Sequence, residues 1–160
     1  MTSQINKKFL FSILIFISFI LISAFLIEHG LGHQACKLCL YERIPYFLAI
    51  VLILKIFFIK GYEKIILLVL SIIFIISSIL AFYHFGIEQG FFKESIACSA
   101  KDLSGALTKD EILNQLEQNT ISCKDVSFTI LGFSLATINT ISSIALSVIF
   151  LRLFITYEKN

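Results

Sequence analysis

Four long runs of apolar residues alternate with polar segments along the chain. They cover residues 9–27, 44–59, 65–83 and 126–151. Lys55 is the only charged residue within them, and none shows the period-two alternation of a membrane β-barrel. A helix needs about 20 apolar residues to cross a bilayer. The pattern predicts an all-α integral membrane protein, a bundle of four transmembrane helices that forms one domain over residues 1–160.

Composition and charge narrow the class of protein further. Hydrophobic residues make up 58% of the chain and charged residues 15%, whereas soluble domains have about 45–50% and about 25%. A soluble domain of this size cannot bury so much apolar surface. The formal charge of +2 is too small to indicate a nucleic-acid partner. The expected partner is therefore the lipid bilayer.

The first apolar run follows two lysines and needs to be distinguished from a cleaved signal peptide. It is longer than a signal core and ends in Phe25-Leu-Ile-Glu28, without a small-x-small cleavage site. We interpret it as a retained span.

The basic residues indicate the orientation of the bundle. Four spans place both termini and the connection between the second and third runs on one side. The basic residues there are Lys7, Lys8, Lys60, Lys64, Arg152 and Lys159. Their density on short segments predicts that this side is cytoplasmic. The outer loops, about residues 28–43 and 84–125, would then face the periplasm from a bacterial inner membrane. Thr108–Glu111 has the pattern of a capping box and predicts a short helix in the longer loop.

All four cysteines lie in these outer loops, although free cysteine behaves as a small hydrophobe. Cys36 and Cys39 form a Cys-x-x-Cys pair in the first loop, and Cys98 and Cys123 lie in the second. Cys-x-x-Cys is the spacing of dithiol redox sites and of half a zinc site. The outer side of a bacterial membrane is oxidising. Two cysteine pairs on one membrane face could exchange disulfides as a relay.

The surroundings of Cys39 favour redox chemistry. We expect Pro45 in the first turn of the second helix, whose positive N-terminus then faces the outer loop. Arg43 follows Cys39 by four residues. Both features lower the pKa of a cysteine and favour the reactive thiolate.

A relay also needs an electron acceptor. Leu40 follows Cys39 where haem attachment needs histidine, and the chain has no dinucleotide fingerprint or iron–sulfur cysteine run. By elimination, a lipid-soluble quinone is the expected acceptor.

Several alternatives remain open at this point. A disulfide between Cys98 and Cys123 could only staple the loop of a non-catalytic membrane anchor or subunit. His29 and His33 could join Cys36 and Cys39 in a zinc site, and His33 with His84 could ligate haem. The simpler interpretation of His29 and His33 is as hydrated loop residues. For His84, contact with or support of a quinone competes with an interfacial histidine bonded to backbone or water.

Two polar residues near the predicted helices have simpler interpretations. Glu42 is expected to be solvated or paired with an arginine. Asn139 lies within the fourth run, where a polar side chain needs a partner, so we expect it to bond between helices.

Three segments resemble the disulfide bond formation protein DsbB family. They are Cys36–Tyr46 (CKLCLYERIPY), Tyr83–Gly90 (YHFGIEQG) and Leu131–Asn139 (LGFSLATIN). The number of spans and the order and spacing of the cysteines agree as well, so the resemblance covers nearly the whole chain.

This resemblance implies a membrane disulfide oxidoreductase that reoxidises a periplasmic DsbA-type thiol oxidase. It implies that the partner attacks Cys98, that Cys123 then engages Cys36, and that Cys39 meets a quinone, ubiquinone or menaquinone, with Arg43 supporting the charge. DsbA is a strong oxidant, at about −120 mV, so its regeneration needs a strong electron sink. The membrane quinone pool would supply it. The sequence does not set the direction of flow, and a quinol-driven reductase is the reverse alternative.

Overall fold

The part of the chain that the structure describes forms four long helices and a short hairpin. The computed structural model describes residues 6–33, 35–59, 61–93, 122–124, 128–130 and 132–159. Its helices are α1 (Lys7–Phe25), continued by a π-helical turn (Leu26–Gly30), α2 (Lys37–Phe58), α3 (Glu63–Glu88) and α5 (Leu135–Lys159). Strand β1 (Thr129–Ile130) pairs antiparallel with β2 (Phe133–Ser134). Cys98 and the predicted helix at 108–118 lie outside the described residues.

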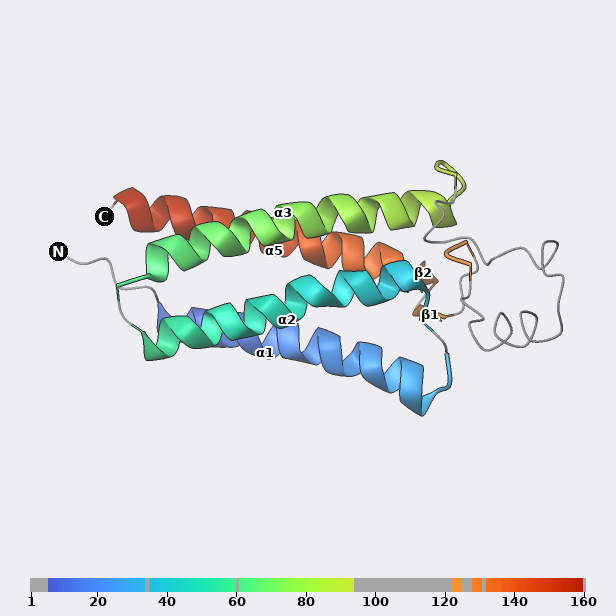
Figure 1. The fold of residues 1–160 in the computed structure, drawn as a ribbon, viewed down its shortest axis with the longest axis horizontal. Coiled ribbons are helices and arrows are strands. Elements are labelled where there is room, and N and C mark those ends of the chain that lie inside the picture. The colour runs from blue at the N-terminus through green and yellow to red at the C-terminus, as the bar shows by residue number, and fades with distance from the viewer. Residues whose placement is uncertain are drawn as a thin grey trace, which may run out of the picture.

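The helices run up and down along one long axis (Figure 1). The start of α1 and the end of α5 lie at one end, together with the end of α2 and the start of α3, and the hairpin lies at the opposite end. Helix α3 has its most extensive contact with α5, while α2 contacts both α1 and α3. The start of α2 and the end of α3 therefore meet at the hairpin end of the molecule.

Helix α2 begins earlier than the hydropathy pattern predicts. It starts at Lys37, seven residues before the apolar run, so that Cys39 and Arg43 are helical rather than in a loop. Pro45 consequently lies inside the helix, and its predicted place in the first turn is wrong. The reason is that Cys36 caps the helix, because its sulfur accepts a hydrogen bond from the Cys39 N–H at 3.2 Å.

The ends of the long outer loop also differ from the prediction. Helix α3 continues to Glu88, and α5 begins only at Leu135 because the hairpin precedes it. Gly132, between the strands, has a φ of +84°, a left-handed conformation that favours glycine. Ser134 accepts a hydrogen bond from the Thr137 N–H and donates one to Glu88, which joins the start of α5 to the end of α3.

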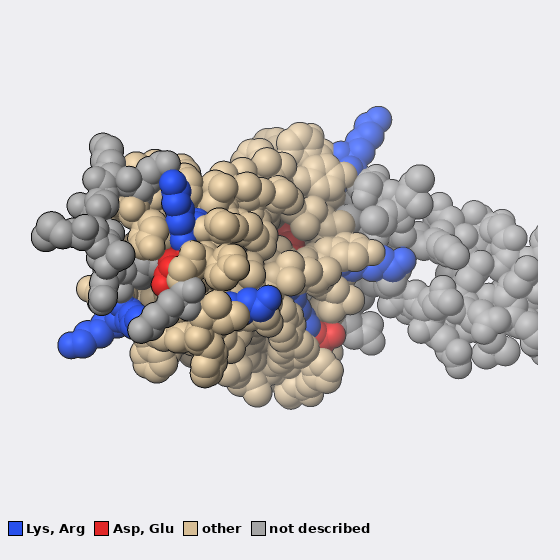
Figure 2. Space-filling model, turned by 60° about the vertical axis from the view of Figure 1, so that its left-hand side comes forward, with Lys and Arg blue, Asp and Glu red and all other residues tan. Residues whose placement is uncertain are grey.

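Three of the helices are long and apolar enough to cross a membrane. These segments are Lys7–Gly30, Glu63–Glu88 and Leu135–Tyr157. In the most apolar 18 residues of each segment, only 22%, 39% and 28% of the residues, respectively, are buried in the bundle. Helical surfaces this apolar require lipid. Figure 2 shows mostly uncharged residues, with lysine and arginine as scattered single side chains. The protein is thus a helical membrane protein. Among described residues α2 does not meet the same criterion, since Glu42, Arg43 and Lys55 interrupt it, and the four-span count stays a prediction.

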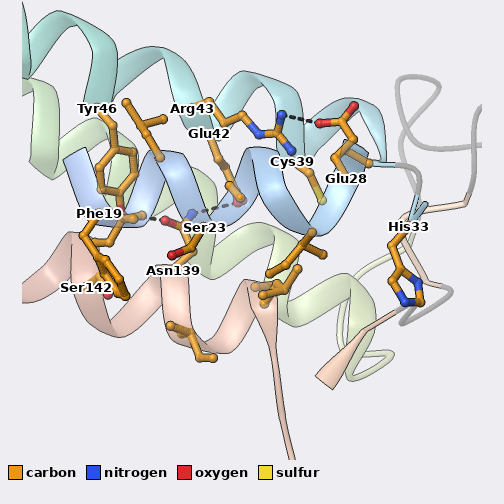
Figure 3. Close-up of a pocket in the computed structure, with 18 residues that line it drawn as sticks. Phe19, Ser23, Glu28, His33, Cys39, Glu42, Arg43, Tyr46, Asn139 and Ser142 are labelled. Carbon is orange, nitrogen blue, oxygen red and sulfur yellow. Dashed lines mark hydrogen bonds and ion pairs between the residues drawn. The ribbon is translucent and has the colours of Figure 1, made fainter. Parts of the chain in front are cut away.

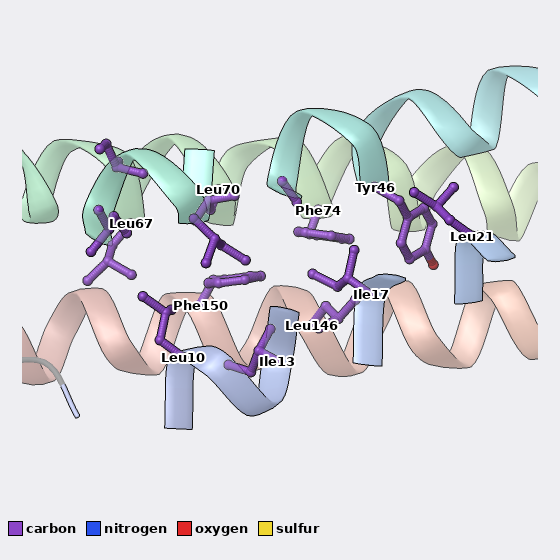
Figure 4. Packing of buried hydrophobic residues seen from close by; sticks show 14 residues of the cluster. Leu10, Ile13, Ile17, Leu21, Tyr46, Leu67, Leu70, Phe74, Leu146 and Phe150 are labelled. Atoms are coloured by element: carbon purple, nitrogen blue, oxygen red, sulfur yellow. The ribbon is translucent and has the colours of Figure 1, made fainter. Parts of the chain in front are cut away.

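An aromatic stack lies at the centre of the bundle (Figure 4). Phe74 of α3 stacks on Phe150 of α5 with ring centroids 5.4 Å apart, and Tyr46 of α2 meets Phe74 edge-on at 5.5 Å. Ile17 of α1 belongs to the same cluster of buried side chains. Because lipid is as apolar as these residues, close packing rather than escape from water holds the helices together.

Truncating this stack should destabilise the protein. We expect Phe74→Ala to lower the free energy of unfolding by about 3 kcal/mol, because Phe74 is 0% exposed and its loss leaves a cavity. Phe11→Ala is the matched control, since Phe11 is 54% exposed on the outside of α1. Unfolding in detergent micelles measures both, and equal losses would contradict the packing described above.

Candidate functional site

Cys36 and Cys39 form a dithiol at the start of α2. Their sulfur atoms are 2.7 Å apart and joined by a hydrogen bond. Both cysteines are free; Cys36 is buried and Cys39 partly buried. The helix turn itself imposes this approach, because the capping residue and the third helical residue lie on the same side. The pair is therefore positioned to form and break a disulfide.

Cys36 is the more acidic member of the pair. The hydrogen bond from the Cys39 thiol lowers the pKa of Cys36 to about 4, although burial opposes this shift. His84, whose Nε2 lies 3.5 Å from the Cys36 sulfur, lowers the pKa further. These contacts favour the thiolate form of Cys36 over the thiol. The sequence predicts that Arg43 and the helix N-terminus lower the pKa of Cys39 as well, and this prediction is wrong, because the hydrogen bond with Cys36 and burial raise the pKa of Cys39.

A hydrogen-bonded chain of buried polar side chains leads away from Cys36. His84 of α3 binds Glu42 through Nδ1 at 3.0 Å. The other carboxylate oxygen of Glu42 accepts a hydrogen bond from Asn139 of α5 at 2.7 Å, and Tyr46 donates to Asn139 at 2.6 Å. The predicted interhelical role of Asn139 is thereby confirmed. Helices α2, α3 and α5 meet in this chain.

Glu42 was assigned wrongly from the sequence. Its side chain is only 5% exposed, and its partners are a histidine and an asparagine rather than water or an arginine. The physical reason is helical geometry, because adjacent residues point about 100° apart on a helix. Glu42 faces the bundle together with Leu38 and Tyr46, four residues before and after it, all of which are buried. That spacing was the signal that could have found it.

Arg43 points instead toward α1. Its guanidinium forms an ion pair with Glu28 of the π-helical turn and lies 4.9 Å from the ring centroid of Phe25. π-Helical turns within or beside α-helices occur frequently at functional sites. The turn thus presents an acidic partner to the one arginine near Cys39.

A cavity of about 330 Å³ lies between α1, α2 and α5. Most of its lining is apolar, and its polar residues include Cys39, Glu42, Arg43 and Asn139 (Figure 3). Cys36 and His84 are not among the described residues that line it. The volume and the few polar groups on an apolar wall are typical of a site for a small apolar ligand with polar ends.

The other histidines take no part in the dithiol site. His29 is exposed and bonded to the Phe25 carbonyl, and His33 packs on Phe128 beside the cavity. Within the described ranges, the ligating atoms that come together, all within 4.8 Å of one another, belong to Cys36, Cys39 and His84. The set of four zinc ligands that includes His29 and His33 is not assembled there.

Cys123 lies against the dithiol. It is disulfide-bonded and 2% exposed, and it belongs to the same cluster of buried side chains as Cys36, Leu38 and Ile87. Two of the three described cysteines are thus free while the third is oxidised, within a single cluster.

Comparison with known proteins assigns the chain to a family. The sequence matches the family of the disulfide bond formation protein DsbB over residues 6–153. The chain belongs to the DsbB family. It is also similar to an uncharacterized protein of Rickettsia prowazekii (strain Madrid E), with 33% identity over 156 residues, which covers 96% of this chain and 90% of that protein. No solved structure matches the chain.

Members of the DsbB family are membrane disulfide oxidoreductases that work with quinones in general. The free dithiol, the neighbouring disulfide and the cavity are the features such chemistry needs. In this DsbB-family chain, Cys39 links the dithiol to the cavity, because it is bonded to Cys36 and also lines the cavity wall.

The acidity of Cys36 gives a pH prediction. Because its pKa is lowered to about 4, alkylation of Cys36 in the reduced protein should proceed at a nearly constant rate from pH 6 to 8, and should fall only as the pH drops toward about 4. Cys39→Ala removes the hydrogen-bond donor, so the pKa of Cys36 should rise and its alkylation at pH 5 should slow. Mass spectrometry of the alkylated protein measures the rate. An unchanged profile in Cys39→Ala would contradict the assigned cause.

Proposed function

We propose that this protein reoxidises a periplasmic DsbA-type thiol oxidase and passes the electrons through two cysteine pairs to a membrane quinone, ubiquinone or menaquinone. The observation that carries the proposal is the position of Cys39, within bonding reach of Cys36 and on the wall of an apolar cavity that also contains Arg43. Membership of the DsbB family supports it.

In this proposal the chain is one domain that crosses the bacterial inner membrane four times. The start of α1 and the end of α5 lie at the same end of the bundle, which supports an even number of crossings, and the basic residues near that end support its cytoplasmic placement. The dithiol then faces the periplasm at the opposite end. Helix α2 crosses with Glu42 and Arg43 near its outer end, where both have partners.

The residues around the cavity fit a quinone. A bound quinone accepts two electrons and two protons. Arg43 would hold one of its oxygens through the guanidinium, Cys39 would face the ring, and apolar side chains of α1 and α5 would exclude water. The Glu28 partner keeps the guanidinium at the cavity wall.

Electrons reach the dithiol by disulfide exchange. The two thiols of the partner are oxidised as they reduce the disulfide of Cys98 and Cys123, with Cys98 attacked first. The freed Cys123 thiolate attacks the sulfur of Cys36 in an oxidised Cys36–Cys39 pair, which releases Cys39 as a thiolate at the cavity. The Cys98 thiolate then attacks Cys123, which re-forms the Cys98–Cys123 disulfide and releases Cys36. The burial of Cys123 in the cluster of Cys36 supports this order. Cys98 lies outside the described residues, and its role rests on the family resemblance.

The proposed route can be tested with purified protein, a reduced DsbA-type partner and quinone, by following quinone reduction spectroscopically. The wild type should turn over, and Cys39→Ser should abolish quinone reduction. Cys98→Ser should lose turnover with the partner yet retain quinone reduction driven by a small dithiol, since that reductant reaches the Cys36–Cys39 disulfide directly. A membrane anchor with structural disulfides would show no turnover at all, and full activity of Cys39→Ser would refute the mechanism.

Arg43 should contribute to quinone affinity. Loss of a hydrogen bond from a charged donor costs about 1.5–3 kcal/mol, so Arg43→Gln should raise the KM for quinone at least about tenfold. Lys37→Gln is the matched control, because Lys37 is an exposed positive charge at the start of the same helix and does not line the cavity. Equal effects of the two variants would point to surface charge rather than direct contact.

A further inference from the structure

Oxidation of the dithiol by a quinone requires two protons to reach the cavity. The S–S bond forms as two S–H bonds are lost, and the two electrons and two protons end on the two quinone oxygens. Cys39 lines the cavity and can release its proton there directly. Cys36 is buried behind it and does not line the cavity. A thiol proton from Cys36 therefore needs a route through the protein.

The structure contains one such route among its described residues. From the Cys36 sulfur it passes to His84 Nε2 at 3.5 Å, and from His84 Nδ1 to the Glu42 carboxylate at 3.0 Å. Glu42 lines the cavity, so the route ends where the quinone would bind. An imidazole can take up a proton at one nitrogen and release another from the other nitrogen, which is the chemistry each of these contacts needs.

We infer that His84 and Glu42 form a proton relay that carries the proton of Cys36 to the quinone cavity. This inference rests on the proposed function. In the reduced protein the proton from Cys36 is held on His84 Nε2, so that Cys36 is the thiolate. As the S–S bond forms, His84 gives the proton on Nδ1 to Glu42, and Glu42 delivers a proton to a quinone oxygen. His84 thus contacts Cys36 but does not line the cavity, whereas Glu42 lines the cavity and would contact the quinone.

The surrounding contacts hold Glu42 in this position. Asn139 donates to the second carboxylate oxygen at 2.7 Å, which leaves the first oxygen to His84. An amide side chain releases its N–H protons too slowly to serve in a proton relay. Asn139 therefore orients Glu42 but does not carry the proton further toward α5. Glu88, one turn beyond His84 on α3, binds Ser134 instead and does not line the cavity.

The first test needs no quinone. Nitrogen NMR of histidine-labelled protein reports the protonation state of each imidazole, and His84→Gln assigns the signal. We expect His84 to carry a proton on both nitrogens when the dithiol is reduced at pH 7, and on one nitrogen when Cys36 and Cys39 are oxidised. In Glu42→Gln, the doubly protonated form should be lost. An identical His84 signal in the two redox states of the wild type would overturn the relay, because a purely structural histidine would give that result.

The second test measures the rate at which quinone oxidises the dithiol in a single turnover. Glu42→Gln should slow this step about 100-fold, the usual range for a lost general acid or base, with an unchanged Kd for quinone. Glu88→Gln makes the same substitution on a carboxylate outside the relay and should oxidise at the wild-type rate. Glu42→Gln within twofold of wild type would overturn the relay alone. A wild type that does not reduce quinone would instead overturn the proposed function.

Discussion

The arrangement of this site depends on one buried carboxylate. Glu42 lies inside an apolar helix bundle, where an unpaired charge would cost several kcal/mol. It is accommodated because His84 of α3 and Asn139 of α5 each bind one of its oxygens. These two contacts fix the rotation of α2 relative to its neighbours, and with it the direction in which every residue of the Cys36–Tyr46 segment points.

That rotation separates two environments on adjacent faces of α2. On the inner face, Cys36 contacts His84 and is shielded from the cavity. On the face toward α1, Cys39 and Arg43 reach the cavity wall. A dithiol placed across this boundary can exchange disulfides on one side and meet a lipid-soluble ligand on the other.

The hydropathy pattern located the four long helices of the described residues, and the cysteine spacing located the dithiol, because both signals are local. The helix ends were missed for a physical reason. An apolar run is taken to end at charged residues, yet α2 includes Glu42 and Arg43. Both side chains are accommodated because each has a partner on another segment, His84 for Glu42 and Glu28 for Arg43. Arg43 pairs with Glu28, which lies fifteen residues earlier in a π-helical turn. The contact of His84 with Cys36 joins residues 48 positions apart, and no local pattern encodes such a contact.

The position of Glu28 explains how the cavity can hold a full positive charge beside apolar side chains. An arginine without a partner on such a wall would draw water or turn toward the surface. The ion pair with Glu28 and the face of Phe25 hold the guanidinium at the wall instead, and both partners belong to the end of α1 and its π-helical turn. Helix α1 therefore supplies more than an apolar wall. Since α5 supplies Asn139, the cavity exists only when α1, α2 and α5 pack together, which links the stability of the bundle to the presence of the cavity.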